Sequence, residues 1–284
     1  MGGSEWYIQD MDVGMQAAAD AAAVGLVECD PGGTRDGVRR CAAELAEAGV
    51  DGLISMQPFA DLADEVCATL GDVPVVGIIY DQGTCQVSLL EVDQGRSGRL
   101  AGEALGALAA DRWQCQVKAY VELASGAGDV VGTTRLEGFR EGYREHCELP
   151  RQQRTLNAAQ HLITAKTRMG KLLEKVSGKP IVVAGVTDLA VLGAREAAVE
   201  LGRGGQVWAA GQLADPAARQ AIACDSRYVA SVAQFPERFG DQVVPALQAA
   251  VAGLEIAPRM EADLELVTPE NVRTLFPDTE PCDT

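Results

Sequence analysis

Residues 182–212 read VVAGVTDLAVLGAREAAVELGRGGQVWAAGQ, in which two short apolar runs flank an Ala-rich segment. Two such runs around an amphipathic segment are typical of a βαβ unit with parallel strands. Thr187 and Asp188 stand where the first strand would end. The stretch therefore predicts an open α/β sheet with polar side chains at the carboxyl ends of its strands, where such sheets bind ligands.

The same alternation of strands and helices extends along the whole chain. In the first part it predicts strands at 24–29, 52–56, 73–79 and 87–92 and helices at 11–23, 35–48, 60–70 and 98–111. In the second part it predicts strands at 118–123, 153–156, 181–185, 207–210, 228–232 and 264–267 and helices at 132–146, 163–177, 189–201, 215–223 and 239–252. A chain of 284 residues exceeds one ordinary core. We therefore expect two doubly wound lobes with a cleft between them.

Composition narrows the range of partners and compartments. With a formal charge of -17, nucleic acid is not an expected partner, because phosphates are bound mainly by Lys and Arg. The opening residues MGGSEWY lack the basic and apolar regions of a signal peptide, and the apolar runs are strand-sized rather than membrane-spanning. The eight Cys form no CxxC motif and only two His are present, which disfavours a zinc site. The sequence does not decide whether these cysteines form disulfides or are buried free thiols, and their spacing predicts no particular pairing.

Polar residues at strand ends are the candidate ligand-binding residues. Each also has a simpler interpretation, because Asp, Thr and Gln at these places often cap the next helix or turn. The candidates are Gln57, Asp81, Gln82, Asp93, Thr187, Asp188 and Gln234.

Enzyme motifs are weak in this sequence. Residues 126–132, GAGDVVG, have the spacing GxGxxxG and no acidic residue follows at the distance that a dinucleotide site needs. Neither a GxSxG elbow nor a GxxxxGK[ST] loop occurs. We expect no catalytic residue, no metal and no cofactor.

Seven motifs occur in an order that resembles the ribose-type and galactose-type periplasmic sugar-binding proteins of bacterial ABC importers. The resemblance covers about residues 6–272, and the motifs are DGLISMQP (51–58), VPVVGIIYDQ (73–82), VDQGRSGRLAGEAL (92–105), RLEGFREGY (135–143), GVTDLAVLGAREAAVELG (185–202), SVAQFPERFG (231–240) and VTPENV (267–272). The resemblance implies a type I periplasmic binding protein fold with three crossings between lobes. The N-terminal lobe would hold residues 1–113 and 236–262, and the C-terminal lobe 114–235 and 263–284.

The resemblance also implies a function and a set of ligand contacts. Trp6 and Tyr7 match aromatic residues that stack on a sugar ring, Gln57 and Asp81 match partners of sugar hydroxyls, and Gln234 matches a glutamine of the last crossing strand. The implied partners are a sugar or polyol and an ABC transporter permease, in an extracytoplasmic location. Hinge closure on the ligand would then produce the form that docks on the permease.

Three departures from the family weaken this implied site. Thr133 stands where the family commonly has Arg, Thr187 where it has Asn, and Leu213 where it has Asp. We therefore expect a ligand with fewer hydroxyls, or one held by other residues such as Gln160 or His161.

The first strand of the family pattern is absent, because only residues 1–4 precede Glu5. Loss of a central parallel strand leaves backbone groups unpaired, at a cost of roughly several kcal/mol. We expect that the natural chain extends upstream, where a signal peptide would also lie, or that residues 5–12 or a neighbouring chain fill the gap.

Two other functions remain open on the sequence. The effector-binding domain of a lactose-repressor type transcription regulator shares this fold, and it would carry its DNA-binding segment before the first strand. A sensor-kinase ectodomain would carry a membrane span after the last residues.

Overall fold

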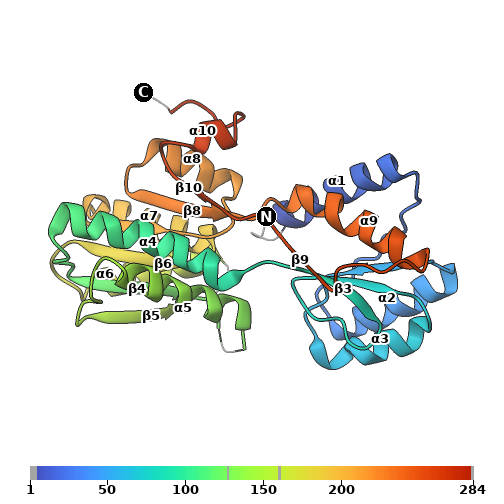
Figure 1. Ribbon diagram of the computed structural model, residues 1–284. Helices are drawn as coiled ribbons and strands as arrows, with labels where there is room; N and C mark the ends of the chain where they lie inside the picture. Colours follow the sequence, from blue (N-terminus) through green and yellow to red (C-terminus); the bar gives the residue numbers. More distant parts are fainter. Residues whose placement is uncertain (1–4, 127, 159–160, 283–284) are drawn as a thin grey trace. The chain divides into compact units, whose positions relative to one another are not determined.

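The chain forms two α/β units (Figure 1). The computed structural model describes residues 5–126, 128–158 and 161–282. Unit 1 comprises Met1–Trp6, Asp93–Gln234 and Leu264–Thr284, and unit 2 comprises Tyr7–Val92 and Phe235–Asp263. The chain therefore passes between the units after Trp6, Val92, Gln234 and Asp263.

Unit 2 is a parallel sheet with helices on both faces. Its strands follow the order β1-β2-β3-β9, with β1 at Leu53–Ser55, β2 at Val75–Ile78, β3 at Gln86–Glu91 and β9 at Arg259–Glu261. Figure 1 shows α1 (Glu5–Ala22) and α9 (Phe239–Val251) on one side of this sheet and α2 (Arg35–Ala48) and α3 (Ala63–Leu70) on the other. Because β1, β2 and β3 run parallel, their carboxyl ends lie along one edge.

Unit 1 has a longer sheet in the order β10-β8-β7-β6-β4-β5, parallel except for β10. The strands are β4 (Ala119–Ala124), β5 (Gln153–Asn157), β6 (Ile181–Gly185), β7 (Val207–Ala210), β8 (Tyr228–Ala233) and β10 (Glu265–Val267). Contacts place α4 (Gln94–Trp113) and α5 (Val130–Arg144) against one face of the sheet. The other face carries α6 (Leu162–Leu173), α7 (Asp188–Glu200) and α8 (Pro216–Cys224), and the short α10 (Val272–Leu275) packs on α8.

Helix α4 belongs to unit 1, whereas the sequence analysis assigned residues up to 113 to the N-terminal lobe. The reason is a close contact between the backbones of α4 and α5, which glycines make possible. A Cβ atom on Gly106 would lie 2.7 Å from the carbonyl oxygen of Tyr143, and one on Gly98 would lie closer still to that of Arg135. This backbone contact holds α4 against α5, and α4 therefore packs in unit 1. The crossings after Gln234 and Asp263 lie within one residue of the expected positions, whereas the crossing after Trp6 was not expected.

The strand predicted at 24–29 does not form, and this prediction was wrong. The segment has no regular secondary structure, and its residues alternate between half-buried and exposed. No strand of the described chain pairs with it, because the sheet ends at β1. A strand needs a neighbouring strand to pair with its N–H and C=O groups. The apolar character of residues 24–29 was therefore not enough to predict a strand.

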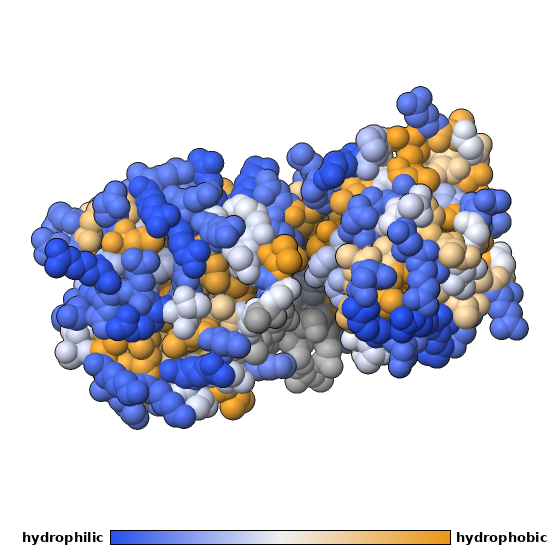
Figure 2. All heavy atoms as spheres, turned by 90° about the horizontal axis from the view of Figure 1, so that it is seen from below, coloured by the Kyte–Doolittle hydropathy of each residue, from blue (hydrophilic) through white to orange (hydrophobic). Residues whose placement is uncertain are grey.

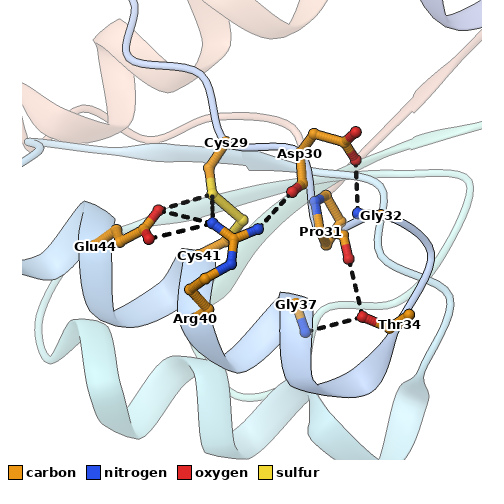
Figure 3. The surroundings of a disulfide bond; sticks show 9 residues. All are labelled: Cys29, Asp30, Pro31, Gly32, Thr34, Gly37, Arg40, Cys41 and Glu44. Carbon is orange, nitrogen blue, oxygen red and sulfur yellow. Dashed lines mark hydrogen bonds and ion pairs between the residues drawn. A yellow bond between two sulfur atoms is a disulfide. The ribbon is translucent and has the colours of Figure 1, made fainter.

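Covalent and ionic contacts hold this unpaired segment instead (Figure 3). A disulfide joins Cys29 to Cys41 of α2, and the Arg40 guanidinium donates a 2.7 Å hydrogen bond to the Asp30 carbonyl oxygen. Arg40 also pairs with Glu44 at 3.0 Å. Thr34 then caps α2 by accepting from the Gly37 N–H. The disulfide therefore replaces strand pairing as the anchor of this connection.

The other predicted elements form, with the predicted ends at 35–48, 181–185 and 207–210 and with shifted ends elsewhere. Helix α1 begins at Glu5 rather than Met11, and β9 and α10 were not predicted. Trp6 and Tyr7 thus lie in the first turn of a helix.

The visible surface of each unit is mostly hydrophilic, with small apolar areas between charged side chains (Figure 2). Among the described residues, no helix combines the length and apolar character needed to cross a bilayer. Scattered apolar side chains such as Val13, Val130 and Ile163 are exposed singly, as is normal for a folded chain.

Candidate functional site

The carboxyl edge of the unit 2 sheet carries a group of linked amide side chains. Gln82 follows β2 and is buried; its Nε2 donates to the carbonyl oxygens of Gln57 at 3.1 Å and Tyr80 at 2.8 Å. Its Oε1 accepts from the Ser55 hydroxyl at 2.8 Å. The amide of Gln82 is therefore used in joining the ends of β1 and β2.

Gln57 and Asp81 stand beside it in different environments. Gln57 is buried, and its Oε1 accepts the Phe59 N–H at 2.7 Å. Asp81 is exposed, and its Oδ1 accepts the Gly83 N–H at 2.9 Å. The carboxylate of Asp81 forms a turn and still presents oxygen to solvent.

The carboxyl edge of the unit 1 sheet contains a buried carboxylate cluster around Asp188. Asp188 accepts hydrogen bonds from the Tyr228 hydroxyl at 2.6 Å, the Ser231 hydroxyl at 2.8 Å and the Asp215 N–H at 2.9 Å. Burial raises the pKa of Asp188, and the neighbouring Asp215 carboxylate adds to the rise, against the lowering by Tyr228 and Ser231. Asp188 therefore supports the ends of β6, β7 and β8 from inside the unit.

This cluster holds a strained turn after β7. Leu213 and Ala214 have φ of 96° and 52°, a region that residues with a Cβ rarely occupy. The Leu213 N–H donates to the Val232 carbonyl oxygen at 2.9 Å, and the Ala214 N–H donates to the Ser231 hydroxyl at 2.9 Å. Since Ser231 donates onward to Asp188, the strain is balanced by a continuous set of hydrogen bonds.

Strain also occurs at the carboxyl edge of unit 2. Ile79, which follows β2, has a φ of 65°, an outlier for a β-branched residue. Its N–H donates to the Leu90 carbonyl oxygen at 2.9 Å. Strained residues tend to gather at functional sites, so both carboxyl edges are candidates.

A second group of amides in unit 1 surrounds Arg135, which is buried. Its Nε donates to Oε1 of Gln94 at 2.7 Å, and a terminal nitrogen donates to the Val186 carbonyl oxygen at 2.9 Å. Gln234, also buried, donates to the same Oε1 of Gln94 at 3.4 Å. Residues at the start of α4 and the ends of β6 and β8 are thus joined.

Comparison with known proteins identifies the family. Residues 2–255 match the model of a periplasmic binding protein domain. The chain belongs to this family.

Solved structures with the same fold include three solute-binding proteins of ABC transporters. One from Actinobacillus succinogenes 130z, with bound D-allose, has a TM-score of 0.79 at 14% identity over 95% of this chain and 96% of that one. One from Bacillus halodurans C-125, with bound myo-inositol, has a TM-score of 0.80 at 20% identity over 96% and 94%. The arabinose-transporter component from Shewanella sp. ANA-3, bound to L-arabinofuranose, has a TM-score of 0.80 at 19% identity over 98% and 93%. No curated protein matches the chain.

The aromatic pair expected to stack on a sugar has other neighbours in this periplasmic binding protein. The Trp6 ring lies 5.6 Å from the Arg219 guanidinium, which also covers the Phe276 ring at 3.7 Å. Tyr7 is buried in unit 2 and meets the Phe239 ring edge-on, at 6.2 Å between centroids. Tyr7 is therefore a core residue of its unit, and Trp6 is half-buried.

The three positions of departure also have defined roles. Thr187 caps α7 by accepting the Ala190 N–H at 3.4 Å, and Thr133 is exposed and donates to the Asp129 carbonyl oxygen at 2.7 Å. Leu213 is half-buried at the strained turn. Asp93 caps α4 by accepting the Arg96 N–H at 2.8 Å. Gln160 lies outside the described residues, and His161 is exposed just before α6.

Two polar residues at the unit 1 edge were missed by the sequence analysis. Gln94 directly follows Asp93, which the analysis singled out, and Ser125 directly follows β4. The Nε2 atom of Gln94 and the hydroxyl of Ser125 are buried without a hydrogen-bond partner among the described residues. The strand-end rule that selected Gln57 would also have found Ser125, whereas Gln94 looked like an ordinary first residue of a helix.

Proposed function

We propose that the chain is an extracytoplasmic solute-binding protein that captures a sugar or related polyol and delivers it to an ABC importer without altering it. The observation that carries this proposal is membership of the periplasmic binding protein family over residues 2–255. The solved structures described above carry D-allose, myo-inositol and L-arabinofuranose, which supports a polyhydroxylated ligand.

The ligand-binding groups in this proposal lie at the carboxyl edge of each sheet. In unit 2 they are Gln57 and Asp81, and in unit 1 they are Gln94, Ser125 and Gln234. Amides and carboxylates suit sugar hydroxyls because each hydroxyl both donates and accepts. Leu213, where the family commonly has Asp, would offer an apolar contact to a C–H face of the ligand.

The disulfides support the extracytoplasmic location independently of the family. They join Cys29 to Cys41, Cys67 to Cys85, Cys115 to Cys147 and Cys224 to Cys282. All eight cysteines of the chain are therefore paired. Such a set persists in oxidising compartments and is rare where thiols are kept reduced. This argues for transport and against a transcription regulator, which works in the cytoplasm.

A thermal-shift screen tests the proposal. D-Allose, D-galactose, L-arabinose and myo-inositol are added separately to the purified protein. A ligand that binds only the folded state raises the melting temperature, by an amount that corresponds to about 2.7 kcal/mol at a hundred times its Kd. Recovery of the compound unchanged, by mass spectrometry, is expected. Flat responses to all four, or chemical conversion of any of them, would refute the proposal.

A point variant tests the site. Asp81→Ala removes an exposed carboxylate and is expected to weaken ligand binding by about 1–3 kcal/mol, through loss of a hydroxyl partner. Exposed Asp278→Ala, in the C-terminal segment of unit 1, serves as the control. Equal affinity of both variants by calorimetry would exclude Asp81 from the site.

A further inference from the structure

The lysines of this chain are confined to one part of unit 1. The whole sequence contains five of them, Lys118, Lys166, Lys171, Lys175 and Lys179. Residues 166–179 also contain Arg168 and a single acidic residue, Glu174, so this segment holds five cationic side chains and one anionic side chain, a charge of +4. The chain as a whole has a formal charge of -17. A basic segment in so acidic a protein indicates an anionic partner.

The fold brings Lys118 to the same place, at the edge of the unit 1 sheet where its parallel strands begin. Lys118 directly precedes β4, and Lys179 lies just before the neighbouring parallel strand β6. The Lys118 N–H donates to the Pro180 carbonyl oxygen at 2.8 Å. A Cβ atom on Gly178 would lie 3.4 Å from the Lys118 side chain. Lys118 and the segment that follows α6 therefore form one surface.

The connection between α6 and β6, which carries Lys175 and Lys179, is held in place by hydrogen bonds. The Lys175 N–H donates to the Leu172 carbonyl oxygen at 3.0 Å. The guanidinium of Arg203 donates to the carbonyl oxygens of Val176 at 2.7 Å and Gly178 at 3.3 Å. The backbone therefore presents these lysines from a defined position.

Five cationic side chains at this surface are exposed and form no ion pair with a residue that the structure describes. They are Lys118, Arg168, Lys171, Lys175 and Lys179, which we call the lysine patch. Arg168, Lys171 and Lys175 follow one another at spacings of three and four residues, which places them on one side of α6 and the turn after it. Lys166 differs, because its Nζ pairs with Glu200 at 2.7 Å and Glu196 at 3.2 Å.

Helix stability accounts for only part of the patch. A cation in the last turn of a helix interacts favourably with the last carbonyl groups, and Lys171 lies in the last turn of α6. Lys118 and Lys179 precede strands, where this interaction does not exist. Attraction to an anionic partner accounts for all five residues.

The surface suits an extended partner better than a small anion. The hollow between α6 and α7, of about 400 Å³, is lined by Lys166 and Lys171 but also by Glu174 and Glu200, whose carboxylates repel an anion. Lysine is a hydrated point charge on a flexible stem, so it suits diffuse attraction to a charged surface more than bidentate binding of one phosphate. Clusters of about four to eight basic residues are typical of proteins that bind anionic phospholipid.

We propose that the lysine patch docks unit 1 on a membrane surface of anionic phospholipid. The inference goes beyond the proposed function, because Lys118 and the candidate ligand-binding residue Ser125 stand at opposite ends of β4. Docking through the patch leaves the carboxyl edge of this sheet open to solution. Near an anionic membrane each lysine raises the binding constant about fivefold, and salt screens the attraction.

Co-sedimentation with vesicles tests the proposal on the full chain. The vesicles contain phosphatidylglycerol and phosphatidylcholine in equal parts, or phosphatidylcholine alone. We expect binding to the first kind only, and release when NaCl is raised from about 0.05 M to about 0.5 M. The triple variant Lys171→Gln, Lys175→Gln, Lys179→Gln should bind the anionic vesicles about a hundredfold more weakly, because Gln keeps the helix propensity of Lys but not its charge.

A second triple variant, with the same change of net charge, is the matched control. It carries Arg35→Gln, Arg39→Gln and Arg259→Gln, three exposed positions of unit 2. Each of these arginines is already paired with a carboxylate and offers little net attraction to an anionic surface. Binding of this variant to anionic vesicles should stay within about twofold of that of the unsubstituted protein.

Three results on the vesicles would overturn the inference. They are equal binding to both kinds of vesicle, equal binding of the lysine variant and the unsubstituted protein, and an equal loss in both triple variants, which would reflect net charge alone. If circular dichroism shows that the lysine variant does not fold, the vesicle comparison and the salt series on the unsubstituted protein decide.

Other occupants of the patch give different results, and each of these also overturns the inference. Binding to soluble polyphosphate without binding to vesicles would assign the patch to a soluble polyanion. A dimer in sedimentation equilibrium that the lysine variant dissolves would assign it to a second copy of the chain. The proposed function is tested separately, because the lysine variant should keep the response to sugars in the thermal-shift screen. Vesicle binding without any response to sugars refutes the function and leaves the inference.

Discussion

The substitution Gly138→Ala tests the close packing that joins α4 to α5. A Cβ atom on Gly138 would lie 2.9 Å from the Arg99 backbone nitrogen and closer to the Gly95 carbonyl oxygen. Ordinary contacts between such atoms begin at about 3.5 Å. Both neighbours are backbone atoms of a helix, so they cannot rotate away as a side chain would. The two helices would have to separate.

The expected cost follows from two opposing terms. Overpacking costs about 1–3 kcal/mol, and the higher helix propensity of Ala returns about 1 kcal/mol. We therefore expect a net loss of up to about 2 kcal/mol in the free energy of unfolding. In a chain of this size a loss of about 2 kcal/mol corresponds to roughly 4–8 °C in melting temperature, by circular dichroism.

Gly170→Ala is the matched control, because it makes the same change inside α6, where a Cβ atom would meet nothing within 4 Å. Only the propensity term applies there, so this variant should gain about 1 kcal/mol. Equal stability of the two variants would refute the argument that backbone contact holds α4 on unit 1.

Three further predictions concern other parts of the molecule. Burial raises the pKa of Asp188 to about 8, whereas an unfolded Asp titrates near about 3.9. The stability that this group contributes is therefore complete below about pH 4 and is lost as the pH rises through about 8, and Asp188→Asn should flatten the urea midpoint between pH 5 and 9. An unchanged slope would contradict this. Replacing Cys29 and Cys41 by Ser opens a bridge between residues 12 apart and should cost about 2–4 kcal/mol, with new proteolytic cleavage near residues 24–33; resistance equal to that of the parent would show that the disulfide is not the anchor. Arg140→Met removes the ionic partner of buried Glu122, paired at 2.6 Å, and leaves that carboxylate only the Thr155 hydroxyl at 2.9 Å, so it should lower the free energy of unfolding by about 1–3 kcal/mol. Exposed Arg96→Met, measured by the same urea titration, should change it by less than about 0.5 kcal/mol.

Most of the fold follows from patterns within short segments. The helix at 35–48 was predicted to the residue, because Thr34 supplies a cap before it and Gly49 ends it in a left-handed conformation. The strands at 181–185 and 207–210 were likewise predicted to the residue, because each is a buried apolar run with a boundary signal at both ends. The first follows Pro180 and ends on Gly185, and the second lies between Gln206 and Gly211. The segment 24–29 has the same apolar character and failed, since a strand also requires a partner that no local pattern reveals.

The candidate site was less accessible to sequence analysis. The strand-end rule selected Gln57, Gln82 and Asp188 together, although their environments differ. Gln82 and Asp188 are hydrogen-bonded to residues of their own unit, whereas the Nε2 donor of Gln57 has no partner among the residues that the structure describes. All three residues directly follow a strand or lie near its end. Their position in the sequence therefore cannot distinguish a side chain whose hydrogen bonds are used within the protein from one that could bind a ligand.

Local composition and periodicity therefore determined the α/β class, the succession of elements and the end of each sheet where polar groups gather. Tertiary contacts decided which unit holds α4, where the sheet of unit 2 stops and which polar groups remain available. The physical reason is that strand pairing, helix contact and hydrogen-bond satisfaction join residues far apart in the chain, as Ser231 and Asp188 are, 43 positions apart. The identity of one partner says little about the other until the chain has folded.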